Sequence, residues 1–139
     1  MEIIKAETDE QIKLCIPVLS QLRPDITSTE ILPVIRRQMS FGYQLIYLYD
    51  KHQVLSVAGF RVSENLAWGK HLYVDDLVTD QLHRSQGAGE ALLNGLIDIA
   101  TKNQCQQLHL DSGVQRFEAH RFYLKQRMRI ASHHFMIDL

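Results

Sequence analysis

The sequence has 139 residues, of which 45% are hydrophobic and 22% are charged, and its formal net charge is −1. This length suits one domain with one core, and the weak net charge argues against a broad nucleic-acid surface. No apolar run is long enough to span a membrane, the N-terminus does not resemble a signal peptide, and two cysteines are too few for a disulfide framework. We therefore expect a single cytoplasmic domain over residues 1–139, with no nucleic-acid or membrane partner.

The first predicted elements are a strand at residues 2–6 and a helix over residues 8–21. Thr8 and Asp9 are suited to cap this helix, because their side-chain oxygens can accept hydrogen bonds from its first N–H groups. Pro17 falls inside the helical pattern, where it lacks an N–H and crowds the preceding turn. We expect it to kink or split the helix.

A second helix and a hairpin follow. Thr27 and Glu30 have the spacing of a capping box and predict a helix that ends near Met39. Residues 43–49 and 54–62 are rich in β-formers and flank a polar turn, which is the pattern of a β-hairpin.

The second half of the chain begins with a strand at residues 72–79 and a helix at residues 87–102. A strand at residues 106–111, a helix at residues 114–126 and a terminal strand near residues 130–138 complete the prediction. The order is β-α-α-β-β-β-α-β-α-β, a mixed α/β plan. The apolar face of the helix after the central strand is formed by Ala88, Ala91, Leu92, Leu96 and Ile99.

The loop between the central strand and this helix has the properties of an anion site. The first N–H groups of a helix have no intrahelical partner, and the helix dipole adds positive character there. Gly87 and Gly89 let the backbone approach a ligand closely, and Arg84 adds a charge that can pair with phosphate. The alternative is a tight strand-to-helix turn without a ligand.

Two better-known phosphate loops do not fit. A nucleoside triphosphate loop needs Lys and then Ser or Thr after its second glycine, where this chain has Glu90-Ala91. A dinucleotide loop needs a third small residue where this chain has Leu92.

The pattern Arg84-x-x-Gly87-x-Gly89 resembles the acyl-coenzyme A loop of the GNAT superfamily of N-acetyltransferases. Residues 76–83 have the length that this family uses between its central strand and the loop, and residues 108–112 resemble the next strand. The segment Ala119-His120-Arg121-Phe122-Tyr123 resembles the family's tyrosine helix. The resemblance covers residues 72–128 and implies an α/β (α+β) fold with a mostly antiparallel sheet flanked by helices.

The resemblance also implies the activity: transfer of an acetyl group from acetyl-coenzyme A to an amine, by direct attack through a tetrahedral intermediate. A small-molecule or peptide amine is the expected acceptor, and no metal is expected. The alternative is a non-catalytic coenzyme A-binding or regulatory module on the same fold. The implied coenzyme A-binding residues are Leu77, Val78, Thr79, Arg84, Ser85, Gln86, Gly87, Ala88, Gly89 and Glu90.

Two residues are candidates for catalysis. A tyrosine with a pKa of about 10 stays protonated beside a thiol near 8.5, so Tyr123 is suited to protonate the departing thiolate. Asp76 stands where the family often has an acid, either as a base or as a carboxylate that steers the amine. Because neighbours in a strand face opposite sides, we expect only one of Asp75 and Asp76 to face the pocket. The alternative for Tyr123 is a core residue.

The chain departs from the family pattern at Gln81, Arg116 and Arg127, where proline, asparagine and glycine are usual. Only 11 residues follow Met128, room for one good strand or two very short ones where the family usually has two. The far wall of the acceptor pocket therefore depends on this short segment or on a second subunit, which leaves a homodimer open.

Overall fold

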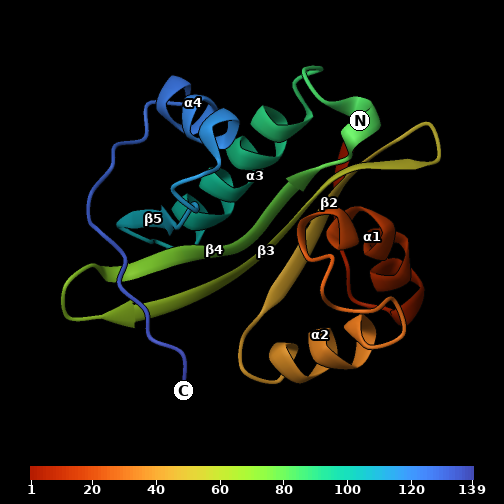
Figure 1. Cartoon of the computed structure of the whole chain (residues 1–139), viewed down its shortest axis with the longest axis horizontal. Coiled ribbons are helices and arrows are strands. Elements are labelled where there is room, and N and C mark those ends of the chain that lie inside the picture. The colour runs from red at the N-terminus through yellow and green to blue at the C-terminus, as the bar shows by residue number, and fades with distance from the viewer. The chain divides into compact units, whose positions relative to one another are not determined.

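The computed structural model describes residues 1–139 (Figure 1). The chain divides into two compact units, Met1–His109 and Leu110–Leu139. None of the helices combines the length and apolar character that a membrane span requires. The elements are β1 (Glu2–Lys5), α1 (Asp9–Leu22), α2 (Ile31–Met39), β2 (Gln44–Asp50), β3 (Gln53–Asn65), β4 (Gly69–Thr79), the 3-10 helix η1 (Gln81–His83), α3 (Ala88–Lys102), β5 (Gln107–Leu110) and α4 (Phe117–Lys125).

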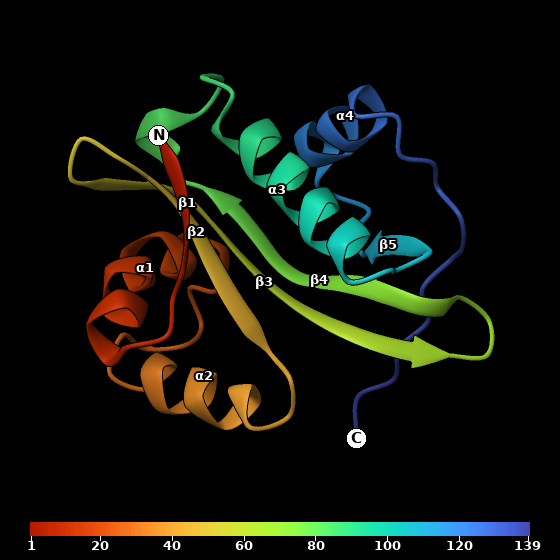
Figure 2. The ribbon, with the colours of Figure 1, turned by 180° about the vertical axis from the view of Figure 1, so that it is seen from behind.

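The first unit is built on a sheet with the strand order β1-β2-β3-β4-β5. Strands β1 to β4 pair antiparallel with their neighbours. Helices α1 and α2 cover one face of this sheet and α3 covers the other, as Figure 2 shows from behind. This arrangement confirms the predicted mixed, mostly antiparallel fold.

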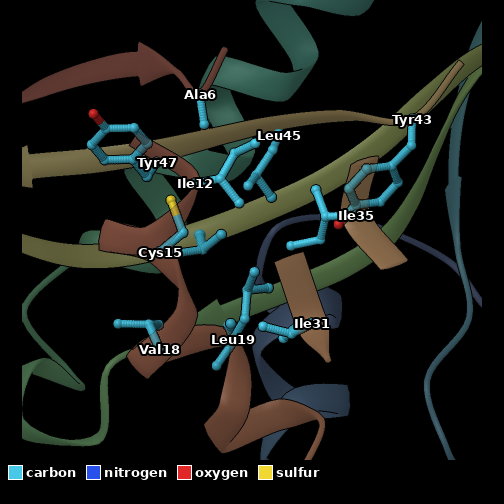
Figure 3. Close-up of a cluster of buried hydrophobic side chains, with 12 residues drawn as sticks. Ala6, Ile12, Cys15, Val18, Leu19, Ile31, Ile35, Tyr43, Leu45 and Tyr47 are labelled. Atoms are coloured by element: carbon cyan, nitrogen blue, oxygen red, sulfur yellow. The ribbon is translucent and has the colours of Figure 1, made fainter. Parts of the chain in front are cut away.

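Alternation along the strands explains why both faces are covered. Successive side chains of a strand point to opposite faces, so an unbroken apolar run buries residues on both sides. In β2, Leu45 and Tyr47 pack against α1 and α2, whereas Ile46 and Leu48 are buried outside that cluster. The cluster on the α1 and α2 face is drawn in Figure 3 and comprises Ala6, Ile12, Cys15, Val18, Leu19, Ile31, Ile35, Tyr43, Leu45, Tyr47, Val57 and Val78.

The start of α1 confirms Thr8 as its cap. The Gln11 N–H donates to the Thr8 hydroxyl over 3.2 Å, and the Gln11 side chain accepts from the Thr8 N–H over 3.0 Å. These reciprocal bonds form a capping box. The helix continues through Pro17 without being split, contrary to that part of the prediction.

The predicted capping box at α2 is wrong. The helix begins at Ile31 with Glu30 as its cap residue and without a side-chain capping bond. The Thr27 hydroxyl lies 3.3 Å from the Thr29 hydroxyl, and the Thr27 carbonyl accepts the N–H groups of Glu30 and Ile31. A backbone turn therefore replaces the expected cap. The Arg36 side chain links α2 to the start of α1, because its Nε donates to Asp9 Oδ1 over 2.9 Å.

The second unit differs more from the prediction. Helix α4 begins three residues later than expected, at Phe117, and no strand forms over residues 130–138. A strand is stabilised by hydrogen bonds to a neighbouring strand, and within Leu110–Leu139 this segment has none. Its apolar side chains are exposed, among them Ile130, Phe135, Met136 and Ile137.

Candidate active site

The loop after β4 leads into α3 through two residues in the left-handed region. Ser85 has φ +63° and Gly87, the cap residue of α3, has φ +83°. The first i to i−4 bond of the helix runs from the Ala91 N–H to the Gly87 carbonyl over 3.0 Å. No side chain caps the helix, so the preceding N–H groups of Ala88, Gly89 and Glu90 are available to an anion.

The surroundings of this loop leave room for a ligand. A Cβ built on Gly87 would meet nothing within 4 Å. Arg84, Ser85 and Gln86 are exposed, and only Ala88 is buried, beneath the helix start. The loop therefore has the donors, the charge and the open space that a pyrophosphate requires.

A contact from α1 holds the start of the loop in place. The Gln21 amide donates to Asp80 Oδ1 over 2.8 Å and accepts the Gln81 N–H over 2.9 Å. The His83 ring lies 2.7 Å from Asp80 Oδ2. The Gln21 bond, followed by the His83 contact, keeps the pKa of Asp80 below its usual value despite partial burial. A proline at position 81 would lack the N–H that bonds Gln21.

The end of β4 presents backbone on the side away from β3. Leu77, Val78 and Thr79 pair with Ala58, Val57 and Ser56 of β3. On the other side, the Gln106 N–H donates to the Lys70 carbonyl over 2.7 Å, just before the four residues of β5. Four residues from that point cannot reach residues 77–79, so no strand of the first unit pairs with this edge.

Asp75 and Asp76 face the same side of the sheet, so the prediction that only one faces the pocket is wrong. Gly59 pairs with Asp76 and Phe60 with Val74, which leaves Asp75 as an extra residue in β4. This is a β-bulge, and it shifts the alternation of side chains by one position. Both carboxylates therefore line one cavity with α1 and α2.

Asp76 is held by two partners from distant parts of the chain. The Arg23 Nε donates to Oδ1 over 2.9 Å, and the Tyr43 hydroxyl donates to Oδ2 over 2.7 Å. Burial, together with the charge of Asp76, raises the pKa of Tyr43 well above 10. Tyr43 therefore remains a neutral donor and not a base.

Asp75 has a partner of its own. The Arg61 Nε donates to Asp75 Oδ2 over 2.8 Å, and the Arg61 Nη2 donates to Gln38 over 3.0 Å. The Arg61 guanidinium also lies 5.6 Å from the centre of the Tyr43 ring. Gly59 makes this packing possible, because a Cβ there would overlap the Tyr43 hydroxyl.

No local pattern in the sequence pointed to Arg23, Tyr43 and Arg61, because they are far apart along the chain. A glycine inside a predicted strand, Gly59, was the one available hint, since such glycines mark bulges or close approaches. The cavity has a volume of about 260 Å³ and is lined by Leu19, Arg23, Ile26, Ile31, Val34, Ile35, Gln38, Tyr43, Asp75 and Asp76.

Tyr123 lies on α4 in the second unit. Burial raises the pKa of Tyr123 above its usual value of 10, and the opposing effect of Arg116 is smaller. Its phenol therefore stays protonated at neutral pH, as a proton donor must. Its joint action with the loop of the first unit stays a prediction.

The end of α4 shows how the chain replaces the usual glycine. The Met128 N–H donates to the Tyr123 carbonyl and the Arg127 N–H to the Leu124 carbonyl, which together form a Schellman motif. Arg127 takes the left-handed position of this motif, with φ +67°. The helix end is thus preserved at the cost of backbone strain.

Comparison with known proteins assigns the chain to a family. The sequence profile of the Acetyltransferase (GNAT) family matches residues 17–127. The uncharacterized N-acetyltransferase YhdJ of Bacillus subtilis (strain 168) is 33% identical over 108 residues, which cover 77% of this chain and 76% of YhdJ. The chain therefore belongs to the GNAT acetyltransferase family and is an acyltransferase.

Solved structures agree on the fold. A ribosomal-protein-alanine N-acetyltransferase from Brucella melitensis biovar Abortus 2308 has a TM-score of 0.84 at 13% identity, with 100% of both chains covered. The glucosamine-6-phosphate N-acetyltransferase from Arabidopsis thaliana has a TM-score of 0.78 at 21% identity, with 99% of this chain and 97% of that chain covered. Family members generally move an acetyl group from acetyl-coenzyme A to an amine.

Proposed function

We propose that residues 1–139 form a single acetyl-coenzyme A-dependent N-acetyltransferase domain. The observation that carries this proposal is the uncapped start of α3 behind Gly87, in a chain of the GNAT family. The N–H groups of Ala88, Gly89 and Glu90, with the Arg84 guanidinium, bind the pyrophosphate of the coenzyme. Ser85 and Gln86 shape the loop around it.

The backbone of Leu77, Val78 and Thr79 binds the pantetheine arm as an added strand, because no strand of the first unit pairs with that edge. One of these N–H groups, near Val78, stabilises the oxyanion. Bound acetyl-coenzyme A supplies the acetyl thioester.

The remaining chemistry belongs to two side chains. Asp76, in the cavity beside α1 and α2, receives the acceptor ammonium, which must lose one proton before its nitrogen can attack. A carbon–nitrogen bond forms and the carbon–sulfur bond breaks. Tyr123 returns a proton to the thiolate, a role that its raised pKa supports.

The thermal midpoint with and without acetyl-coenzyme A tests the cofactor assignment. Wild type should gain roughly 2.7 kcal/mol at a hundred times the dissociation constant, and Gly87→Glu should lose this gain, because it places a carboxylate against the phosphates. Gly42→Glu is the matched control: Gly42 also has a left-handed φ, +100°, and open space, but lies before β2. The absence of a gain in wild type would reject the proposal.

Turnover with a panel of amines separates the enzyme from a non-catalytic binding module. Tyr123→Phe should keep the thermal gain from acetyl-coenzyme A and lower kcat by about a hundredfold or more. An unchanged kcat in this variant would remove Tyr123 from the mechanism. A wild type that binds acetyl-coenzyme A and acetylates no amine would favour the binding module.

A further inference from the structure

The ion-pair network at the cavity between α1, α2 and β4 contains charges of both signs in equal number. Asp75, Asp76 and Arg23 line the cavity, and Arg61 pairs with Asp75 from outside the lining. Because the sum is zero, this network offers no excess negative charge to a polycationic amine. An acceptor that fits it should itself carry both charges.

The hydrogen bonds leave one group of each sign unused. Arg23 engages its Nε with Asp76 and its Nη2 with the Asp75 carbonyl, at 2.9 and 3.0 Å, which leaves the two N–H groups of Nη1 free. Asp75 engages Oδ2 with Arg61, which leaves Oδ1 free. Arg23 and Asp75 are in direct contact, because Arg23 Nη2 donates to the Asp75 carbonyl.

Exposure allows a ligand to reach both groups. The Arg23 side chain is 47% exposed, and the Asp75 side chain is 22% exposed. The pairing of Arg23 with Asp76 fixes the direction of the guanidinium, so less entropy is lost when Nη1 binds a carboxylate. An ammonium group is attracted at the same time by Asp75 and Asp76.

The rest of the cavity is apolar and small. Leu19, Ile26, Ile31, Val34 and Ile35 form its apolar lining. The volume of about 260 Å³ is near the lower end of ligand pockets, which commonly span about 300–1,000 Å³. The space suits a compact aliphatic group.

We propose that the acceptor is a small zwitterion, an amine with its own carboxylate and an aliphatic side chain, as in a free aliphatic amino acid. This inference rests on the proposed acetyltransferase function. Arg23 Nη1 binds the carboxylate, the two aspartates hold the ammonium, and the isoleucines contact the side chain. The acetyl group passes from sulfur to nitrogen, so the products are the N-acetyl amino acid, the free thiol of the coenzyme and one proton.

The test compares three acceptors that differ at one group: L-leucine, L-leucinamide, which lacks the carboxylate charge, and isoamylamine, which lacks the carboxylate. Acetylated product is measured by mass spectrometry, with spermidine as the polycationic comparison. The kcat/KM for leucine should exceed that for leucinamide by about tenfold to a hundredfold. This ratio corresponds to the free energy that a hydrogen bond to a charged group contributes. Leucine alone should also raise the thermal midpoint more than leucinamide does.

Arg23→Gln distinguishes carboxylate binding from the mere positioning of Asp76. The variant should lower kcat/KM for leucine much more than for leucinamide, so that the preference for leucine is lost, whereas Arg23→Lys should retain part of the preference. Arg37→Gln is the matched control, because Arg37 is an exposed arginine of α2 outside the cavity lining. An equal loss for leucine and leucinamide in Arg23→Gln would overturn the inference.

The remaining outcomes separate this inference from the function on which it rests. Turnover of leucinamide, isoamylamine or spermidine as fast as leucine in wild type would overturn the zwitterion and leave the acetyltransferase intact. No thermal gain from acetyl-coenzyme A, together with no product from any amine, would overturn both.

Discussion

The loop after β4 and the cavity beside α1 and α2 are built by opposite means. The loop is one contiguous stretch, residues 84–90, and offers mainly backbone N–H groups from an uncapped helix. The cavity gathers side chains from α1, α2, β4 and the connections between elements, and its polar groups bond one another. The loop should therefore tolerate many side-chain substitutions but few changes of backbone conformation. The cavity should be sensitive to side-chain substitutions and less sensitive to backbone changes.

Alkaline pH should distinguish the two regions most strongly, because the buried side chains that can lose a proton at high pH lie on the same side of the sheet as the cavity. Burial raises the pKa of Cys15 from 9.0 to about 12, and it raises that of Tyr43 in the same direction. Above pH 9 the unfolded chain loses the thiol proton and the folded chain keeps it. Through Cys15 alone, stability should thus fall by about 2 kcal/mol between pH 9 and 11, and Tyr43 should add a further loss above pH 10.

Denaturant unfolding at several pH values checks this fall. Cys15→Ala should be less stable at pH 8 because it leaves a small void, yet it should lose stability more slowly with rising pH. Cys105→Ala retains the buried thiol and should keep the wild-type slope. An unchanged slope in Cys15→Ala would mean that the thiol does not titrate differently in the two states.

A smaller effect is expected at Gly59, where the cavity network depends on close packing. In Gly59→Ala the new Cβ would overlap the Tyr43 hydroxyl and force the ring away from Asp76. Such overpacking costs about 1–3 kcal/mol, measurable as a lower thermal midpoint. The thermal gain from acetyl-coenzyme A should remain, since the loop is untouched.

A double-mutant cycle with Tyr43→Leu assigns the cost at Gly59. Leucine lacks the atoms that the new Cβ would overlap, so Gly59→Ala should cost much less in that background. The same cost in both backgrounds would place the strain in the backbone of β3.

The smallest effect on stability is expected at the end of α4, where a residue other than glycine occupies the left-handed region that Gly87 occupies in the loop. Arg127→Gly should raise the free energy of unfolding by about 1 kcal/mol, because glycine adopts φ +67° without strain but is more flexible when unfolded. Arg127→Ala removes the side-chain charge and keeps the strain, so it should not stabilise. If alanine stabilises as much as glycine, the charge and not the backbone is responsible.

Local chemistry made much of the protein predictable. The Thr8 cap, the hairpin, the central strand, the glycine loop and the helix after it follow from residues close together in the sequence, and the structure has each of these elements. The predictions that failed needed non-local information. A backbone turn replaces the capping box predicted at Thr27. The segment over residues 130–138, predicted as a strand, has no neighbouring strand within its unit.

The sequence by itself determined the order of the elements from β1 to α4, the glycine loop and the tyrosine helix, because helix periodicity, capping and left-handed glycine are local properties. Only the tertiary structure decided that Asp75 and Asp76 face one cavity. Their common direction comes from a bulge opposite Gly59 and Phe60, which exists only when β3 and β4 pair. Arg23, Tyr43 and Arg61 reach these carboxylates for the same reason: pairing of strands and packing of helices join segments that the sequence keeps apart.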